Sequence, residues 1–208
     1  MPDKSSFKDL KQTERETRKG IILEAAIKLF NEKVLHRVGM RDIAAEAGIS
    51  AATIYRYFDS RDDIIVEALV QDINAIEKRL EVLLKNEQIT IKELAVAVVD
   101  YLLDNEPTFQ MMCYFLTSSS VDPEARKKFD LVQEYFINMF NMKLNKKGFS
   151  SHALFTSAFI ASICGVVLTF RNYPGLNTEE KREYMHQMAM TIITEGGALS
   201  MLKGGNDH

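Results

Sequence analysis

Apolar residues in the first part of the chain recur every three or four positions, which is the period of an amphipathic α-helix. The clearest stripe lies between residues 21 and 30 and consists of Ile21, Ile22, Ala25, Ala26, Leu29 and Phe30. No alternation of apolar and polar residues persists over the length of a strand, and the chain has only 10 glycines and 4 prolines. The pattern therefore predicts an all-α fold.

Capping and turn signals divide this pattern into about nine helices. Ser60 with Asp63, and Thr90 with Glu93, have the spacing of helix amino-terminal caps, and Pro123 suits a first helical position. The predicted helices cover residues 14–33 (or an earlier start), 40–47, 51–57, 61–85, 91–104, 106–117, 123–146, 151–172 and 178–202.

The two short helices and the glycine between them form an ordered set. Ala44 is small, Gly48 follows four residues later, and Ile54 follows six residues after that. Two short helices that cross steeply need a small residue at the crossing, a glycine in the turn and a branched apolar residue that packs back, which is the helix-turn-helix arrangement. The rest of its small core is predicted to be Ile43, Ala47, Ile49 and Phe58.

The second short helix is predicted to present polar and small side chains outward: Ala51, Ala52, Thr53, Tyr55, Arg56 and Tyr57. Small residues let the helix backbone approach base edges in a major groove, and Thr53 and Arg56 can donate hydrogen bonds to them. Tyrosine hydroxyls suit phosphate oxygens. The alternative is that both tyrosines are core aromatics of a helical bundle, but Ile54 and Phe58 already occupy the inward positions.

Charge is unevenly distributed along the chain. The net charge is −3 overall, but residues 1–60 hold 11 Lys and Arg against 9 Asp and Glu, whereas the remainder holds 15 against 20. This asymmetry predicts a small neutral-to-basic module over residues 1–60, with a basic amino-terminal extension, followed by a larger acidic domain over residues 61–208. Because the first module contains the helix-turn-helix, we interpret it as the DNA-binding domain.

The amino-terminal extension carries Lys4, Lys8, Lys11, Arg15 and Arg18 at steps of four, three, four and three. If this segment is helical, all five positions share one stripe beside the DNA-binding module. Two alternatives remain open at this stage: a solvated disordered tail, and a flexible basic arm that contacts DNA.

The stretch from Arg18 to Leu69 resembles the TetR family of transcriptional regulators. The similarity lies in ILEAAIKLF, in RDIAAEAGISAATIYRYF and in DSRDDI leading into a long helix. The resemblance implies a three-helix DNA-binding domain in front of a helical ligand-binding and dimerisation domain. It also implies DNA contacts by Thr53, Tyr55 and Tyr57, and by Arg41 and Arg61 at the starts of two helices. The chain departs from the family pattern at three positions: Val34, Gly39 and Met40.

The stretch from Gly148 to Phe170 carries no formal charge and is predicted either to form an interface helix or to anchor the chain in a membrane. Its serines and threonines favour the interface helix over a membrane anchor, so we predict no membrane partner. We predict that the helix packs against a second copy of the chain in a homodimer. Part of this helix could instead belong to the core of the single chain. The predicted interface residues are Ala158, Ala161, Ser162 and Gly165, together with Met188 and Ile192 of the last helix.

Methionine and aromatic residues are frequent in the middle helices, as in binding sites for hydrophobic or amphipathic small molecules. Candidate ligand-binding residues are Tyr101, Asp104, Met112, Tyr114, Phe115, Phe136, Phe140, Thr156 and Phe159. Ordinary core packing explains the same pattern, so both interpretations stay open. Coupling between the two sites predicts a repressor that releases its palindromic DNA operator when an effector displaces the long helix that begins at Arg61. Activation in place of repression is the open alternative.

An enzyme is not predicted. The four histidines and two cysteines match no metal-binding or nucleophile spacing, and no glycine-rich phosphate loop is present, so no catalytic residue, metal or cofactor is assigned. Two widely separated cysteines and a polar amino terminus predict a cytoplasmic protein. The alternative function is a helical adaptor or structural protein that does not bind DNA.

Overall fold

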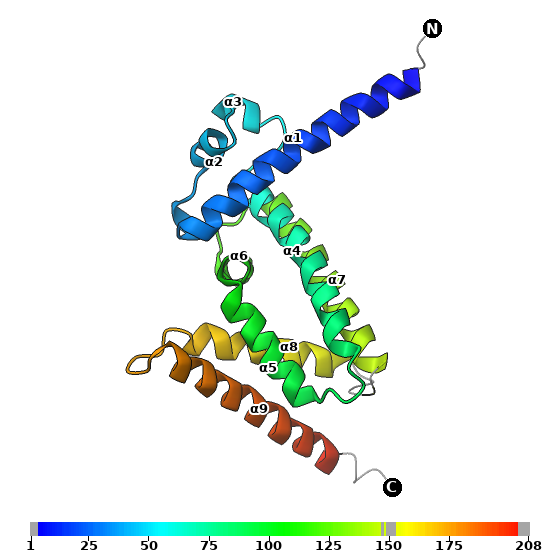
Figure 1. Ribbon diagram of the computed structural model, residues 1–208, viewed down its shortest axis with the longest axis vertical. Coiled ribbons are helices and arrows are strands. Elements are labelled where there is room, and N and C mark those ends of the chain that lie inside the picture. The colour runs from blue at the N-terminus through cyan, green and yellow to red at the C-terminus, as the bar shows by residue number, and fades with distance from the viewer. Residues whose placement is uncertain (1–3, 147, 149–152, 204–208) are drawn as a thin grey trace. The chain divides into compact units, whose positions relative to one another are not determined.

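The computed structural model describes residues 4–146, 148 and 153–203. These residues form nine α-helices and one short 3-10 helix and contain no strand, which confirms the predicted all-α fold (Figure 1). The helices are α1 (Lys4–Glu32), η1 (Leu35–Arg37), α2 (Met40–Glu46), α3 (Ala51–Ile54), α4 (Arg61–Leu84), α5 (Ile91–Asp104), α6 (Glu106–Thr117), α7 (Pro123–Lys146), α8 (Ala153–Phe170) and α9 (Thr178–Lys203).

The predicted amino-terminal caps are present. The Thr90 amide donates to Glu93 Oε2 at 2.7 Å, and the Glu93 amide donates to Thr90 Oγ1 at 3.2 Å, which closes a capping box at the start of α5. Asn177 and Glu180 make the equivalent pair of bonds before α9, at 2.8 and 3.0 Å. These local bonds satisfy amides that have no partner inside the helix.

Helix α3 is shorter than predicted, because it ends at Ile54 rather than at residue 57. The amides of Arg56 and Tyr57 bond to carbonyls three residues earlier, at 3.1 and 3.0 Å, so the chain tightens into a turn. That turn carries Phe58 into the core, where only 2% of its surface is exposed. The outward-facing residues of the predicted helix therefore lie partly on a helix and partly on the turn that follows.

The described residues pack into two compact units. The first unit comprises Met1–Asn74 with Pro107–Val132, and the second comprises Ala75–Glu106 with Gln133–His208. The predicted division at residue 60 therefore differs from the division by packing, because the beginning of α4 and segments of α6 and α7 pack with the amino-terminal helices. That residues 1–60 form the DNA-binding domain stays a prediction.

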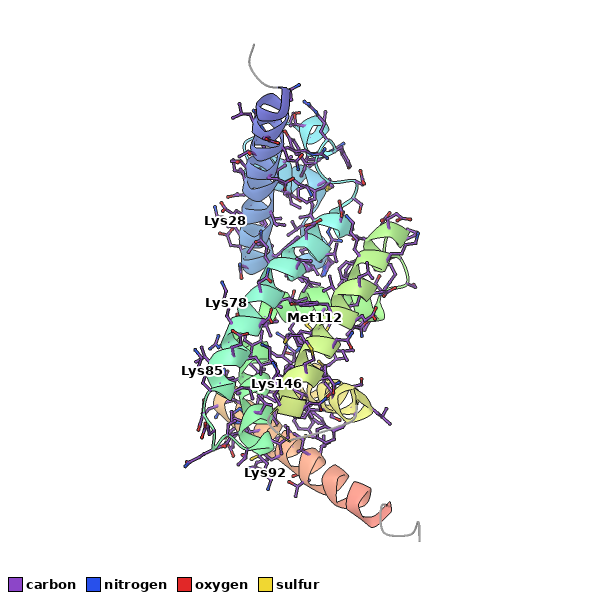
Figure 2. All side chains as sticks on the ribbon, turned by 90° about the vertical axis from the view of Figure 1, so that its right-hand side faces the viewer. Lys28, Lys78, Lys85, Lys92, Met112 and Lys146 are labelled. Carbon is purple, nitrogen blue, oxygen red and sulfur yellow. The ribbon has the colours of Figure 1, made fainter. Side chains whose placement is uncertain are left out.

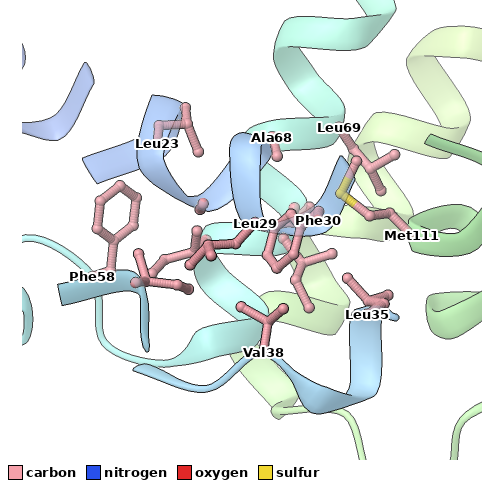
Figure 3. Packing of buried hydrophobic residues seen from close by; sticks show 14 of the residues in the cluster. Leu23, Leu29, Phe30, Leu35, Val38, Phe58, Ala68, Leu69 and Met111 are labelled. Carbon is pink, nitrogen blue, oxygen red and sulfur yellow. The ribbon is translucent and has the colours of Figure 1, made fainter. Parts of the chain in front are cut away.

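One hydrophobic core runs through the first unit. Helix α1 packs against α2, α2 packs against α3, and buried residues of α4, α6 and α7 complete the same cluster. Figure 3 shows Leu29 and Phe30 of α1 beside Val38, with Met111 of α6 also in the cluster. Burying an aliphatic or phenyl side chain of this size stabilises a fold by about 1.5–3 kcal/mol. The helix-turn-helix is thus packed onto the first turns of α4.

In the second unit, α5 packs against α8 and α9, and α8 packs against α9. Its buried residues include Leu94, Phe140, Ile163, Val167 and Met185. Among the described residues, none of the helices combines the length and apolarity that a membrane crossing needs.

Candidate nucleic-acid interface

The turn between α2 and α3 depends on Gly48. This residue has φ of 67°, in the left-handed region that side chains other than glycine adopt at a cost. The Ile49 amide bonds to the Ala44 carbonyl at 2.9 Å across the turn, and Ala44 is buried at the helix crossing. A Cβ at Gly48 would meet no heavy atom within 4 Å, so glycine is needed for the backbone conformation and not for space.

Helix α3 is held in place at both ends. Ser50 caps it, because Ser50 Oγ accepts the Thr53 amide at 3.1 Å and lies 2.8 Å from Thr53 Oγ1. Ile54 and Phe58 are buried, whereas 56% of Tyr55 is exposed. Arg56 is also exposed and Tyr57 is half-buried. Tyr55 is therefore no core aromatic, and the outward orientation expected of it is present.

The remaining predicted DNA-binding residues of the helix-turn-helix also reach the surface. Ala52 and Arg41 are exposed, and Ala51 and Thr53 are half-buried. Before Arg41, the Gly39 amide donates to Asp42 Oδ2 at 2.8 Å. Helix α2 therefore gains a cap from its own third residue, although the serine or threonine usual in the family is absent. Contacts of these residues with DNA stay a prediction.

Arg61 is oriented toward the protein. Its Nη2 donates to the Leu35 carbonyl at 2.6 Å, its Nη1 lies 3.7 Å from Asp62 Oδ1, and its guanidinium lies 5.3 Å from the centre of the Tyr114 ring. Its Nε is buried without a hydrogen-bond partner among the described residues. The DNA contact that the resemblance implies for Arg61 stays a prediction, and it requires the guanidinium to leave the Leu35 carbonyl.

Asp62 and Asp63 connect the first turn of α4 to α6 and α7. Asp62 accepts the Tyr114 hydroxyl at 2.9 Å and the Asp122 amide at 2.8 Å, and Asp63 pairs with the Lys128 ammonium. The bond to Asp63 raises the pKa of Lys128, and burial, followed by the bond to Asp62, raises the pKa of Tyr114. Both carboxylates are buried, and both are bound by residues from distant parts of the sequence through hydrogen bonds or an ion pair.

A basic cleft lies between α1 and the turn after α3. It has a volume of about 420 Å³ and is lined by Lys11, Glu14, Arg15, Arg18, Arg56 and Tyr57. Figure 1 shows the amino-terminal half of α1 continuing beyond the helix-turn-helix, so the predicted extension is helical from Lys4 onward. A neighbouring groove of about 550 Å³, largely apolar, is lined by Leu10, Thr13, Glu14, Thr17, Arg18, Ile21, Ile22, Ala47, Ile49, Thr53 and Tyr57.

The predicted ligand-binding residues fall in both units. Met112, Tyr114 and Phe115 belong to the first, where Phe115 is fully buried and stacks on Phe129 with ring centres 4.6 Å apart. In the second unit the structure brings Phe140 and Phe159 together, with ring centres 5.8 Å apart.

Other predicted ligand-binding residues of the second unit have polar or aromatic partners. Thr156 is buried, and its hydroxyl donates to Asn141 at 2.9 Å. Asp104 is ion-paired with Arg182 at 2.7 Å. The remaining two also contact neighbours, since Tyr101 lies under the Arg79 guanidinium and Phe136 packs beside Phe140. Ligand contacts by this set stay a prediction.

The predicted dimer residues of α8 lie largely on its surface. Ala158, Ala161 and Gly165 are exposed and Ser162 is half-buried. On α9, Ile192 is exposed and Met188 is half-buried. In the part of the chain that the structure describes, no group of three or more His, Cys, Asp or Glu side chains could hold a metal ion.

Comparison with known proteins agrees with this geometry. Residues 22–68 match the family model described as bacterial regulatory proteins, tetR family, and this range runs from α1 through the helix-turn-helix into α4. A nucleoid occlusion factor SlmA from Pasteurella multocida is 26% identical over 166 residues, which are 76% of this chain and 83% of that protein.

Two solved structures share the fold over most of the chain. A protein from Mesorhizobium loti described as a TetR-family transcriptional regulator has a TM-score of 0.65 at 18% identity, over 89% of this chain and 97% of that one. Thermus thermophilus FadR, a TetR-family repressor in complex with lauroyl-CoA, has a TM-score of 0.60 at 15% identity, over 86% and 94% of the two chains. At these identities the structural likeness concerns the fold.

Proposed function

We propose, because this chain belongs to the TetR family of bacterial regulatory proteins, that it is a repressor that binds a palindromic operator as a homodimer. Proteins of this family are transcriptional regulators and not enzymes. The observation that carries the proposal is the outward face of α3 and its following turn, with Tyr55 and Arg56 exposed above buried Ile54 and Phe58. This face can enter a major groove while the core holds the helix rigid.

The surroundings of Thr53, Tyr55 and Arg41 give these residues different roles. Thr53 is half-buried, its hydroxyl oxygen lies 2.8 Å from Ser50 Oγ, and this hydroxyl suits a base edge. Tyr55 is largely exposed and suits a phosphate, a contact that sets the register without reading sequence. Arg41, at the start of α2, is exposed and would contact the flanking backbone.

A second copy of the chain is the partner that covers the exposed face of α8. This face carries Leu154, Ala158, Ala161, Gly165 and Leu168, at steps of four, three, four and three, with 80% of Leu154 and 51% of Leu168 exposed. None of the five is charged, and a Cβ at Gly165 meets no atom within 4 Å, so another helix can approach closely. Two copies present two recognition helices, as a palindrome requires.

The effector is proposed to be hydrophobic or amphipathic and to bind among the helices that follow α3. The phenyl rings of Phe136, Phe140, Phe155 and Phe159 form a continuous aromatic run in the second unit. A fold relative holds lauroyl-CoA, which makes fatty acyl-CoA the first class of compound to test. We propose that the effector binds better when α4 is displaced from its DNA-binding position. The effector would then lower the affinity for DNA by the same coupling free energy by which DNA lowers the affinity for the effector.

The operator is found by incubating the purified chain with duplexes of random sequence and sequencing those retained. We expect a palindromic consensus whose half-sites are separated by one helical turn, about 10–10.5 base pairs, or a multiple of it. Absence of any enriched sequence, together with a lack of salt-dependent binding to duplex DNA, would favour the helical adaptor instead.

Lauroyl-CoA is then titrated into the complex with the selected duplex, with free CoA and a short-chain acyl-CoA as controls. Release of the duplex by lauroyl-CoA alone supports an amphipathic effector. An affinity for DNA that does not change with any acyl-CoA excludes this class of effector but leaves operator binding intact.

A further inference from the structure

We propose that the basic cleft between α1 and the end of α3 binds the phosphate backbone of the operator outside the segment that α3 reads. This inference rests on the proposed operator binding and adds a second contact to it. The partner is the DNA duplex itself, recognised by charge, so the amino-terminal half of α1 lengthens the footprint without adding base readout.

Helical geometry places the basic residues of the extension on one stripe. At 100° per residue, positions 4, 8, 11, 15 and 18 fall within an arc of about 80° on α1, which is continuous from Lys4 to Glu32. The acidic positions 9 and 16 lie at least about 80° outside this arc, whereas position 14 lies only about 40° outside it. From Lys4 onward the extension is thus a helix whose basic positions form one stripe.

The cleft combines this stripe with the end of α3. Lys11, Arg15 and Arg18 face Arg56 and Tyr57 across it, so cations from two elements converge. Glu14 is the single acidic residue in its lining, and its carboxylate is engaged by Arg18 Nη2 at 2.8 Å. That bond raises the pKa of Arg18, whose guanidinium is charged at neutral pH with or without it. The cleft lining therefore has four cations and one carboxylate, which leaves an excess of three positive charges after Glu14 and Arg18 pair.

The spacing of the three cations on α1 suits a polymer with regularly repeated anions better than a single small anion. Lys11, Arg15 and Arg18 are spread over about 10 Å of helix axis, at a rise of 1.5 Å per residue. Phosphates of one DNA strand follow each other every 3.4 Å or so of duplex axis, so several of them fit along this distance. All three cations are exposed, which leaves room for a backbone to lie along them.

This arrangement also changes the expectation for Arg56. Hydrogen bonds to base edges were predicted for it from the sequence, but Arg56 lies beyond the last residue of α3 and lines the cleft with the cations of α1. We therefore assign Arg56 to the phosphates. Its substitution by alanine should weaken binding to all sequences by a similar factor, whereas Thr53→Ala should change the preferred base at one position of each half-site.

The decisive experiment measures the salt dependence of DNA affinity for the variant Lys11→Gln/Arg15→Gln/Arg18→Gln. Its matched control is Lys78→Gln/Lys85→Gln/Lys92→Gln, which removes the same charge from exposed positions of the second unit (Figure 2). A charge-preserving variant, Arg15→Lys/Arg18→Lys, tests the role of charge alone. Circular dichroism checks that each variant is folded.

Affinities are measured between low and moderate salt on two duplexes: the selected palindrome alone, and the same palindrome with ten or so added base pairs on each side. On the longer duplex, the slope of log affinity against log salt should flatten by about 0.9 for each phosphate that is no longer neutralised, counted over both protomers. The control and the lysine variant should keep the wild-type slope. On the short duplex the triple variant should match the wild-type chain.

An unchanged slope for the triple variant on the longer duplex would overturn the inference, as would equal flattening by the control. Either result would leave operator binding by α3 in place, because the wild-type chain still binds the palindrome. Failure of the wild-type chain to bind any selected duplex would instead contradict the proposed function itself. The two failures are therefore distinguishable.

Discussion

The hydroxyl of Tyr114 in α6 donates a 2.9 Å hydrogen bond to Asp62 Oδ1 in the first turn of α4. The Asp122 amide, in front of α7, bonds to the other oxygen of the same carboxylate at 2.8 Å. Because Asp62 is 8% exposed, both bonds are made away from bulk water, where an unpaired carboxylate is costly. Asp62 thus links the first turn of α4 to α6 and to the segment in front of α7, all within the first unit.

Replacing Tyr114 by phenylalanine should lower the free energy of unfolding by about 0.5–1.5 kcal/mol, because one bond to a buried carboxylate is removed while the ring remains. Urea unfolding measures the change. The matched control is Tyr135→Phe, whose hydroxyl bonds to Glu77 at 3.1 Å on an exposed surface. That variant should stay within about 0.5 kcal/mol of wild type. Equal losses of unfolding free energy in the two variants would show that the buried hydrogen bond stabilises the fold no more than the exposed one.

Gly48→Ala should destabilise the chain by about 1–2 kcal/mol, because φ of 67° disfavours any residue with a Cβ although space is available. Gly20→Ala is the control, and it should change stability in the opposite direction. Gly20 lies inside α1, and a Cβ there also meets no atom within 4 Å, so alanine should stabilise by about 0.5–1 kcal/mol. Thermal unfolding of both variants checks the signs, and a neutral Gly48→Ala would argue against the tight turn.

Asp72 should make stability depend on pH. Burial raises its pKa above the ordinary value of 3.8, and the Thr108 hydroxyl, which donates to Asp72 Oδ2 at 2.6 Å, opposes part of this rise. The folded chain therefore binds this proton more tightly than the unfolded chain, so the charged form costs stability at neutral pH. That cost disappears as the pH falls through the raised pKa.

The variant Asp72→Asn should accordingly have a higher Tm than wild type at neutral pH, because the amide oxygen can still accept the Thr108 hydroxyl without a charge. The difference should shrink as the pH falls through the raised pKa and should vanish only well below 3.8, where the aspartate is protonated in both the folded and the unfolded chain. Thermal scans over a pH series measure it. A difference that is constant with pH, or a less stable variant at neutral pH, would contradict the assignment.

Ala161→Glu should convert the proposed dimer into monomers, because it places a charge in the middle of the exposed apolar face of α8. Val82→Glu is the control, since Val82 is 65% exposed on α4. Light scattering after size-exclusion chromatography gives the mass of each variant. A monomeric wild type, or an Ala161→Glu variant that stays dimeric, would remove α8 as the interface.

Short-range signals in the sequence were sufficient for most of the fold. The cap formed by Thr90 and Glu93 and the left-handed turn at Gly48 each depend on residues within a few positions, so their residue types identify them. The prediction placed the end of α3 too late, because the helix ends where Phe58 packs into the core, and that packing is a tertiary interaction. Helix propensity alone would have carried the helix to Tyr57.

The polar links of the first unit could not be predicted from the sequence. Asp62 and Asp63 look like ordinary acidic residues at a helix start, and that interpretation is correct as far as it goes. Their partners Tyr114, Asp122 and Lys128 lie 52 to 65 residues away, and no local spacing relates them. Arg61 was assigned to DNA by its position in the motif, while its bond to the Leu35 carbonyl depends on how the chain packs.

The central claim is that the exposed face of α3 and its following turn binds the operator, and Tyr55 tests it most directly. Tyr55→Ala and Tyr135→Ala remove side chains of similar exposure, 56% and 51%, from different elements. Affinity for the selected duplex is measured by fluorescence anisotropy at one salt concentration. We expect Tyr55→Ala to bind at least about tenfold more weakly than wild type, a loss of about 1.4 kcal/mol, while Tyr135→Ala binds as wild type does. Wild-type affinity in Tyr55→Ala would show that this face does not bind the operator.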